Sequence, residues 1–392
     1  MQTGKFNVLL DGQHGSSGKA KMSCYLADKY NITNVSSSNF PNAAHSFVSG
    51  DIKFIAKAVP TPLVLKRVKG INITGWLSPS SGLAANEELK LDRLYQEWLE
   101  AGKPQIYIHA RASIVTPDHV KCEQSGLNST KHIASTMQGC SAAMIDKILR
   151  KPNCLLAGSK TINEWLSKNY KFYDEFINSV SIINGPEFRS GIHSLLDTGN
   201  TILHEVSQGH ALSIDHGSHF PASTSRNCTV QKAMDDMAVP PQMIGDVYLN
   251  LRVFPIRVGN VYSDDGSLLG YSGDFYPDSK EMTWEEVGKN AGMPEEEIKN
   301  LDKKNLTTVT KRVRRVSTFS MIGFKDAAKT NGATKICINF IQYLNWKDNG
   351  LRDIKKLSKE SRDFVSKIEE AINLPVVLIG TGADNDDVID LL

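Results

Sequence analysis

Short apolar runs alternate along this chain with segments in which apolar residues recur every three or four positions. The apolar runs predict buried strands, and the spaced apolar positions predict helices that cover them. This alternation is typical of an α/β fold with a large, mostly parallel central sheet flanked by helices. The expected strands are residues 6–10, 106–114, 154–157, 202–206, 247–253, 334–341 and 375–379, and the expected helices are residues 18–29, 162–177, 284–290 and 358–372.

The connections between these elements are often long and polar. Residues 31–40 and 264–278 are rich in Asn, Asp, Ser and Gly, which favour turns and loops. Long loops of this kind often carry binding residues on a rigid scaffold. Because no internal repeat or low-complexity linker divides the chain, we expect a single domain over residues 1–392 with long inserted loops.

Composition and charge narrow the function classes. The 392 residues include 45 Lys and Arg against 43 Asp and Glu, and this near-neutral balance argues against a general nucleic-acid binder. No stretch approaches the roughly 18 consecutive apolar residues of a membrane helix, and the first residues lead into an apolar strand instead of a signal peptide. We therefore expect a cytoplasmic protein without a membrane partner. The six cysteines lack metal-site spacing, which favours reduced thiols over a zinc site.

The glycine-rich segment DGQHGSSGKAK, residues 11–21, lies between the first expected strand and the first expected helix. Its three glycines, each three residues apart, let backbone N–H groups approach an anion, and the helix N-terminus adds donors and a favourable dipole. The segment is not a Walker A loop, because five residues separate Gly12 from Gly18 and Ala20 stands where that motif has Ser or Thr. The order of strand, glycines, lysine and helix favours a phosphate cradle over a plain flexible turn.

Two further polar segments contain histidines. Residues 42–46 place His45 after Asn and two alanines, which would let a ligand come close, yet a single histidine is more often structural. Residues 205–225 join an apolar strand ending in Gln208 and Gly209 to a loop dense in Asp, His and hydroxyl groups, where ligands of parallel sheets commonly bind. Taken alone, the first segment does not indicate a function. The second segment fits a binding loop and a structural loop equally well.

An arginine-rich segment, TTVTKRVRR, occupies residues 307–315 and has four cations within five positions. Arginine side chains bind carboxylates in a bidentate fashion, so this loop could hold a dicarboxylate or phosphates. A solvated surface or a nucleic-acid patch is the alternative. The overall charge and the absence of interleaved aromatic residues disfavour nucleic acid.

Taken in order, these segments resemble the adenylosuccinate synthetase family over nearly the whole chain. The family's phosphate loop, Gly-Asp-Glu-Gly-Lys-Gly-Lys, is similar to residues 15–21, and its Asn-Ala-Gly-His-Thr segment is similar to residues 42–46. Its Gln-Gly and Asp-His-Gly segments match residues 208–209 and 215–217. Its Gly-Thr-Thr-Gly-Arg-Gly segment resembles residues 134–139, with Arg150 further on, and its arginine-rich aspartate loop resembles residues 307–315.

The resemblance implies a P-loop-NTPase-like nucleotide site and a role for each matching residue. The implied catalytic residues are Ser16, Lys19, His45 and Gln208. Those implied to bind ATP or its phosphates are Gly15, Ser16, Ser17, Gly18, Lys19, Ala20, Lys21, Arg314, Asn339, Gly380 and Gly382. Those implied to bind the substrate nucleotide are Ser16, Asn42, Ala43, Ser135, Thr136, Gln208, Thr224, Arg312 and, from the other subunit of a homodimer, Arg150. Aspartate would be bound by Thr307, Thr308, Arg312 and Arg314, and Mg²⁺ by Ser16 and Ala44.

Two departures from the family pattern bear on the substrates. Ser16 and Ser17 stand where the family has the aspartate and glutamate of its loop, and that aspartate takes the N1 proton of the purine and binds magnesium. Residues 337–342, CINFIQ, replace the Thr-Lys-x-Asp that recognises guanine of GTP. Phe340 and Ile341 cannot accept the N1 and N2 hydrogens of guanine, so ATP or dATP is the expected phosphate donor.

Both departures resemble the bacteriophage branch of the family, the N6-succino-2-amino-2′-deoxyadenylate synthases. This resemblance implies a carbon–nitrogen ligase that joins dGMP to L-aspartate through a 6-phosphoryl purine, toward 2-aminoadenine nucleotides, in the host cytoplasm if a phage encodes it. Ser16 would leave room for the 2-amino group. A lone hydroxyl is a weak base and magnesium ligand, so a water, Asp11 or the substrate phosphates would compensate. An adenylosuccinate synthetase acting on IMP and a non-catalytic purine-nucleotide-binding regulator are the alternatives.

Overall fold

A ten-stranded sheet runs through the centre of the computed structural model, which describes residues 1–125, 129–307 and 310–392. Every neighbouring pair of strands in it is parallel except one pair at an edge, β18 with β19, which is antiparallel. The expected α/β fold with a mostly parallel sheet is therefore confirmed. From one edge to the other the strands are β19 (Val388–Asp390), β18 (Val376–Gly380), β17 (Lys335–Asn339), β11 (Ile244–Arg252), β1 (Phe6–Asp11), β10 (Ile202–Gly209), β2 (Asn34–Ser37), β5 (Thr74–Leu77), β7 (Gln105–His109) and β9 (Val180–Ile183).

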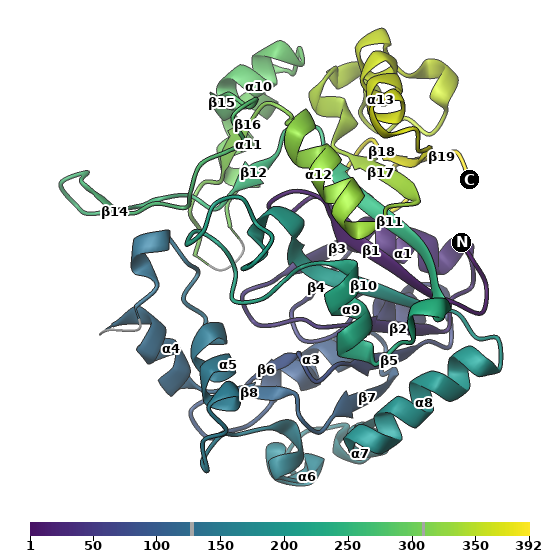
Figure 1. The fold of residues 1–392 in the computed structure, drawn as a ribbon, viewed down its shortest axis with the longest axis vertical. Coiled ribbons are helices and arrows are strands. Elements are labelled where there is room, and N and C mark those ends of the chain that lie inside the picture. Colours follow the sequence, from purple (N-terminus) through teal and green to yellow (C-terminus); the bar gives the residue numbers. More distant parts are fainter. Residues whose placement is uncertain (126–128, 308–309) are drawn as a thin grey trace.

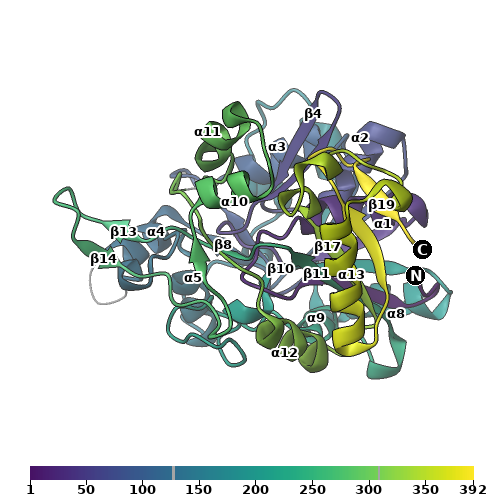
Figure 2. The ribbon, with the colours of Figure 1, turned by 90° about the horizontal axis from the view of Figure 1, so that it is seen from above.

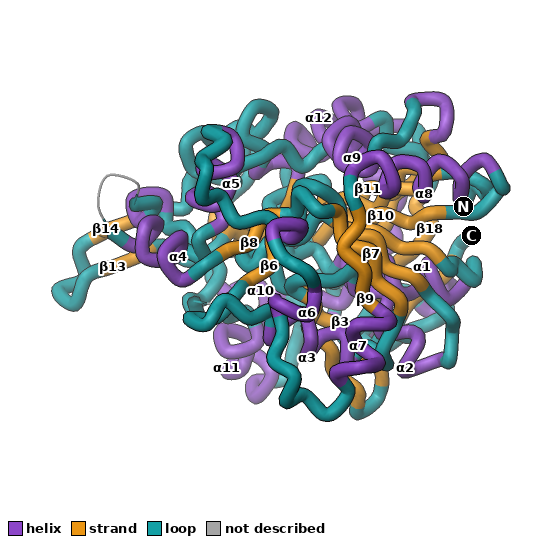
Figure 3. The backbone as a smooth tube through the Cα atoms, turned by 90° about the horizontal axis from the view of Figure 1, so that it is seen from below, coloured by secondary structure: helices purple, strands orange, loops and turns teal. Residues whose placement is uncertain are grey.

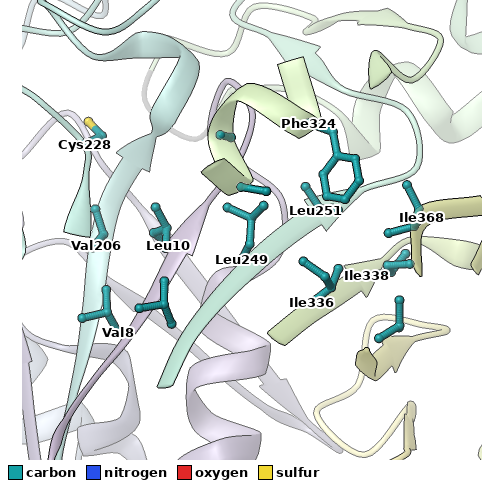
Figure 4. Packing of buried hydrophobic residues seen from close by; sticks show 14 of the residues in the cluster. Val8, Leu10, Val206, Cys228, Leu249, Leu251, Phe324, Ile336, Ile338 and Ile368 are labelled. Carbon is teal, nitrogen blue, oxygen red and sulfur yellow. The ribbon is translucent and has the colours of Figure 1, made fainter. Parts of the chain in front are cut away.

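Helices cover both faces of this sheet (Figure 3). The longer ones on the first face are α8 (Gly185–Asp197), α9 (Val230–Met237), α12 (Met321–Asn331) and α13 (Lys359–Ile372), and those on the second face include α1 (Lys19–Lys29), α3 (Asp92–Glu100) and α7 (Tyr173–Ser179). Alternate strand residues serve the two faces, since Val8 and Leu10 belong to the first hydrophobic core and Leu9 belongs to the second. Figure 4 shows Val8 and Leu10 beside Leu249 and Leu251 in the first core.

Smaller elements stand outside the main sheet. The helices are α2 (Leu65–Lys69), α4 (Pro117–Gln124), α5 (Cys140–Ile148), α6 (Ile162–Trp165), α10 (Trp284–Asn290) and α11 (Glu295–Lys304). The strands form the pairs β3 (His45–Ser49) with β4 (Ile52–Ala56), β6 (Gly82–Ala84) with β8 (Ser113–Val115), and β13 (Val261–Tyr262) with β14 (Leu268–Gly270), and the triplet β12 (Ile256–Arg257), β16 (Arg315–Ser317) and β15 (Glu281–Met282). The β13–β14 hairpin projects from the body of the molecule (Figures 1 and 2).

Most of the expected elements are present with small shifts at their ends. The strands near residues 6–10, 202–206, 247–253, 334–341 and 375–379 and the helices at 18–29, 284–290 and 358–372 are confirmed. None of the helices in the described part of the chain is long and apolar enough to cross a membrane.

Three of the expected elements are wrong. Residues 106–114 form two strands, β7 and β8, because a turn closed by the Ala112 N–H on the His109 carbonyl interrupts them. Residues 154–157 contain no strand and contribute one isolated bridge from Leu156 to Ser113. The helix expected over residues 162–177 is divided into α6 and α7, because residues 166–172 between them are not helical.

The polar stretch at 31–40 also differs from expectation, because its middle forms the central strand β2. The polar side chains of β2 are buried, and two of them, Asn34 and Ser36, have partners on neighbouring strands. The Ser36 hydroxyl lies 2.9 Å from His204 Nδ1, and the Asn34 amide oxygen accepts from Trp76 Nε1 at 3.3 Å. Side-chain partners on adjacent elements thus replace the apolar packing that a sequence pattern would register.

Candidate active site

A cavity of about 690 Å³ lies where neighbouring parallel strands end. Its lining includes residues at or just beyond the carboxyl ends of β1, β10, β11, β17 and β18. Ligands of open α/β sheets bind at this edge. The glycine-rich segment, the His45 segment, the loop after β10 and the arginine-rich segment all contribute to the same lining, so segments up to about 300 residues apart in sequence share one cavity.

The charge of this lining is strongly asymmetric. Its lysines and arginines are Lys19, Lys21, Lys53, Arg252, Arg257, Lys303, Lys304, Lys311 and Arg314, and its carboxylate is Glu123. Glu123 already accepts the backbone N–H groups of Gly139 at 2.7 Å and Ser141 at 2.6 Å. An excess of cations in a concave site attracts ligands with several negative charges, such as nucleotides and dicarboxylates.

The glycine-rich segment folds around the carboxylate of Asp11, the last residue of β1. One carboxylate oxygen accepts the N–H groups of Gln13 at 2.7 Å and Gly15 at 3.3 Å, and the other accepts the N–H group of Ser17 at 3.2 Å and lies 3.4 Å from Lys19 Nζ. Asp11 is fully buried. Since both oxygens are occupied by loop donors, Asp11 holds the loop together and is a poor substitute for the missing loop carboxylate.

The loop ends in an open helix N-terminus. Gly18 caps α1 with φ +86°, a conformation that favours glycine, and no side chain caps the first turn. A Cβ on Gly18 would lie 3.0 Å from Cγ of Asn339, which itself packs against Gly380. The N–H groups at the start of α1 are therefore free to bind an anion, as phosphate cradles require.

The two loop serines point in different directions. Ser16 is exposed, has φ +53° and lines the cavity, and its carbonyl accepts from Arg252 Nη1 at 3.3 Å. Ser17 is buried, and its hydroxyl accepts from the Asn250 amide at 2.6 Å. Of the two serines, Ser16 is the one whose side chain can contact a ligand in the cavity.

Lys21 lines the cavity but is engaged elsewhere. Its ammonium donates to the carbonyls of Gly382 at 2.8 Å and Asp387 at 2.7 Å, which ties the loop after β18 to α1. Burial lowers the pKa of Lys21 to about 8. Lys21 therefore fixes the wall of the cavity that contains Gly382.

His45 begins β3 and lines the cavity next to the small residues Asn42, Ala43 and Ala44. Its Nδ1 lies 2.5 Å from a carboxylate oxygen of Glu205, a buried residue of β10. Burial alone would raise the pKa of Glu205, but the neighbouring charge and contact of His45 outweigh it and lower the pKa. Gln208 follows on the same strand with φ +67° and also lines the cavity.

The arginine-rich segment and the loop before α5 meet on another side of the cavity. Ser135, Thr136, Thr224 and Thr307 line it. Arg314 also lines it, contacts the Leu306 carbonyl, and has its pKa lowered to about 10 by burial. Arg314 forms no ion pair within the described ranges. A partly buried arginine without a carboxylate partner is suited to bind a ligand carboxylate.

Several predicted site residues lie away from the cavity lining. Arg312 donates to the carbonyls of Ala134 at 2.8 Å and Ser135 at 3.0 Å, so it joins two loops. Arg150 is exposed at the end of α5. Ser17 and Gly380 are also absent from the lining. Thr308 lies outside the described residues. By contrast, Gly15, Ser16, Gly18, Lys19, Ala20, Lys21, Asn339 and Gly382 share one wall.

Arg252 is a site residue that the sequence analysis missed. It ends β11, donates to the Ser16 carbonyl and, at 3.2 Å, to the Asn305 amide oxygen, and lies 3.9 Å from the centre of the Phe340 ring. Burial lowers its pKa to about 10. Arg252 thus connects the glycine-rich loop, Asn305 at the end of α11 and the residue that follows β17. An arginine at the end of a mostly apolar strand was the available signal.

His14 is a second missed residue. It is buried, lines the cavity, and neither ring nitrogen has a partner in the described structure. Burial, followed by the charges of Arg257, His219 and Arg315, lowers its pKa well below the ordinary value, so the ring is neutral. Buried polar atoms without partners are uncommon in folded proteins, which marks His14 as a residue that a ligand could satisfy.

An anion cradle at the end of a parallel strand, facing arginines across one cavity, defines a nucleotide-dependent enzyme with an anionic second substrate. A profile of the adenylosuccinate synthetase family matches residues 8–188 and 158–349. The chain belongs to the adenylosuccinate synthetase family.

Individual relatives refine this assignment. The N6-succino-2-amino-2′-deoxyadenylate synthase of Vibrio phage phiVC8 is 31% identical over 347 residues, covering 87% of this chain and 88% of that protein. The adenylosuccinate synthetase of Methanocaldococcus jannaschii is 27% identical, covering 98% of this chain and 96% of that protein. Among solved structures, the succinoaminodeoxyadenylate synthetase of cyanophage S-2L, bound to dGMP and dATP as an energy donor, has a TM-score of 0.75 at 26% identity and covers 100% of this chain and 96% of that one.

Proposed function

We propose that this protein is a carbon–nitrogen ligase that condenses dGMP with L-aspartate, driven by ATP or dATP, to give N6-succino-2-amino-2′-deoxyadenylate. The observation that carries the proposal is Ser16. It is an exposed hydroxyl in the same cavity as Gln208 and Arg314, at the loop position where the family has a carboxylate. The phiVC8 and S-2L relatives support this choice of substrates.

The reaction takes place in two steps. The γ-phosphoryl group of ATP is transferred to O6 of dGMP and ADP leaves, and the amine of aspartate then attacks C6, loses a proton and displaces phosphate together with O6. In phosphoryl transfer the protein mainly positions groups and neutralises charge. Lys19 and the open N-terminus of α1 hold the phosphates of ATP, and Gln208 steadies O6.

His45 hydrogen-bonds to the transferred phosphoryl oxygens, and Ser16 lies beside N1 and C2 of the base, where its small side chain leaves room for the 2-amino group. Ser135, Thr136 and Thr224 bind the phosphate of dGMP, with Asn42 and Ala43 beside the nucleotide. Since Asp11 is occupied by four loop donors, the N1 proton passes to water or to a substrate phosphate.

Aspartate is bound at the arginine-rich segment. Arg314 has no carboxylate partner among the described residues, and in the same segment the hydroxyls of Thr307 and Thr310 lie 2.7 Å apart next to Arg312. Arg312 contributes by fixing this segment to the Ser135 loop, and Thr308 completes the proposed set. A dicarboxylate would satisfy these donors and bring its amine toward C6.

Magnesium fits the same wall of the cavity. Ser16 and Ala44 both line the cavity and would supply a hydroxyl and a carbonyl oxygen, and Mg²⁺ takes few protein ligands when phosphate oxygens and water complete its shell. When bound, the ion would neutralise charge on the transferring phosphoryl group.

The substrate phosphate also needs Arg150, and we propose that it comes from the partner subunit of a homodimer. Within one subunit Arg150 is exposed and outside the cavity lining, and α5 carries the exposed apolar residues Ile145, Ile148 and Leu149 beside it. Mixing Arg150→Leu with Lys19→Met chains tests this. Action in trans restores activity at about a quarter of the sites, whereas action within one subunit restores none.

A substrate matrix tests the proposed function. IMP, GMP and dGMP are each incubated with aspartate and with ATP, dATP or GTP, and phosphate release and product mass are measured. We expect turnover of dGMP with ATP or dATP. A preference for IMP would instead identify an ordinary adenylosuccinate synthetase, and absence of phosphate release with every combination would identify a binding protein.

Because the relatives include phage enzymes, we place the reaction in the cytoplasm of an infected host.

A further inference from the structure

The proposed function gives Glu205 no part in the reaction, yet Glu205 makes the shortest contact of the catalytic histidine. Its Oε1 lies 2.5 Å from Nδ1 of His45. Glu205 is 1% exposed and Nδ1 of His45 is buried, so water does not supply the interactions that these two groups lack. A carboxylate is seldom buried so completely without a specific partner.

Glu205 is itself held from several sides. Its Oε2 accepts from the Ser23 hydroxyl of α1 at 3.0 Å, and its Oε1 accepts from the Thr61 hydroxyl at 3.3 Å. The backbone of Glu205 is paired within the central sheet, where β10 lies between β1 and β2. The carboxylate therefore has a fixed position, and a contact with it fixes the position of the imidazole ring as well.

The two ring nitrogens of His45 have different surroundings. Nδ1 is buried and has no other hydrogen-bond partner among the described residues, and it lies 2.5 Å from Oε1 of Glu205. Nε2 is not among the buried unpartnered atoms and forms no hydrogen bond with a described residue, and His45 lines the cavity. Nε2 is therefore the nitrogen presented to a ligand. Which nitrogen of a histidine faces the substrate is decided by the hydrogen bond that the other one makes.

We propose that Glu205 is a positioning residue for phosphoryl transfer, which acts through His45 by accepting the Nδ1 hydrogen and turning Nε2 toward the transferred phosphoryl group. This inference rests on the proposed function for the identity of that group. Glu205 touches no substrate in this account. Its contribution is to hold one orientation of the ring, which otherwise could flip or rotate out of line with the phosphoryl oxygens.

A double-mutant cycle separates this role from a purely structural one. The variants are Glu205→Gln, His45→Asn and the combination of both, with Ser23→Ala as the matched control, because Ser23 contacts the carboxylate oxygen that faces away from His45. We expect Glu205→Gln to lower kcat by about 10- to 100-fold with little change in KM for dGMP or ATP. In the His45→Asn background the same substitution should change kcat by less than about 3-fold.

Equal losses in both backgrounds, or a loss confined to KM, would overturn the proposal, and so would a Ser23→Ala effect as large as that of Glu205→Gln. Should Glu205→Gln fail to fold, Glu205→Asp keeps the charge but withdraws it from Nδ1, and the same loss of kcat is expected. If the unaltered protein turns over another purine monophosphate instead of dGMP, the proposed function fails and the cycle is run with that substrate.

A second measurement does not depend on activity. In long-range ¹H–¹⁵N spectra of histidine-labelled protein, with His45 assigned from His45→Asn, we expect a protonated Nδ1 protected from solvent exchange. Glu205→Gln should remove that protection or change the tautomer. An unprotonated Nδ1 in the unaltered protein, or identical spectra in the two proteins, would refute the proposed contact whatever the substrate is.

Discussion

Replacing Arg314 by leucine removes the guanidinium proposed to bind a carboxylate of aspartate while keeping a side chain that can fill the space. Arg314 contacts the Leu306 carbonyl and has no acidic partner among the residues that the structure describes, so little native structure depends on its charge. A charge-assisted hydrogen bond contributes about 1.5–3 kcal/mol. At 0.59 kcal/mol for RT, this loss corresponds to an increase of about 10- to 150-fold in the KM for aspartate.

The assay is steady-state phosphate release with aspartate varied at saturating dGMP and ATP. KM for dGMP and ATP should change by less than about 3-fold, since uniform loss would indicate a general distortion. Arg315→Leu is the matched control. Arg315 lies in the same segment but pairs with Glu281 at 2.6 Å and is absent from the cavity lining, so its loss should leave the KM for aspartate unchanged.

An unchanged KM for aspartate in Arg314→Leu would refute the assignment of the arginine-rich segment. A rise in the KM for ATP alone would move Arg314 to the phosphate donor, which is the other role that the family resemblance implies for it. Equal effects of Arg314→Leu and Arg315→Leu would show that the segment as a whole had been disturbed.

Three further substitutions test other parts of the cavity. Ser16→Asp restores a carboxylate beside the base and should lower the ratio of kcat/KM for dGMP to that for IMP by about 10-fold or more, and an unchanged ratio contradicts the steric role of Ser16. Gly18→Ala adds a Cβ at φ +86° and 3.0 Å from Asn339, so it should cost about 1–2 kcal/mol in urea unfolding and raise the KM for ATP, whereas Gly332→Ala, at φ +58° with open space, should leave that KM unchanged. Burial lowers the pKa of Lys21 to about 8, so between pH 8 and 10.5 the unfolded chain binds one proton more than the folded protein. The free energy of unfolding should therefore rise by up to about 3 kcal/mol over this range relative to that of Lys21→Met. Parallel pH curves for the two proteins would contradict this.

The order of the motifs predicted much of the cavity. The glycine-rich loop after β1 and Gln208 near the end of β10 line it because the carboxyl ends of parallel strands meet at one edge of the sheet, and Arg314 lines it from just before β16, outside that sheet. Local patterns sufficed here. The glycine-rich loop and Gln208 each lie near the end of a strand that the sequence predicts, and the sheet brings these two strand ends together.

Other features depended on contacts between distant segments, which a local pattern does not encode. The pairing of His45 with Glu205 joins residues 160 positions apart, and nothing near either residue predicts it. Arg252 lay within an expected apolar strand and was not considered. The sequence predicts a loop at β2 because its residues are mostly polar, whereas in the structure Ser36 contacts His204 on the neighbouring strand β10. Asp11 shows the reverse case, because the sequence makes it a candidate to compensate for Ser16, whereas its loop partners occupy both of its carboxylate oxygens.

The fate of the O6 atom of dGMP tests the central claim most directly. dGMP labelled with ¹⁸O at position 6 is incubated with aspartate, ATP and Mg²⁺, and the released phosphate and the nucleotide product are analysed by mass spectrometry. The account predicts one ¹⁸O atom in each phosphate released with product, because O6 is phosphorylated and then displaced by the amine. Unlabelled phosphate, or ATP hydrolysis that leaves ¹⁸O on the purine, would contradict it.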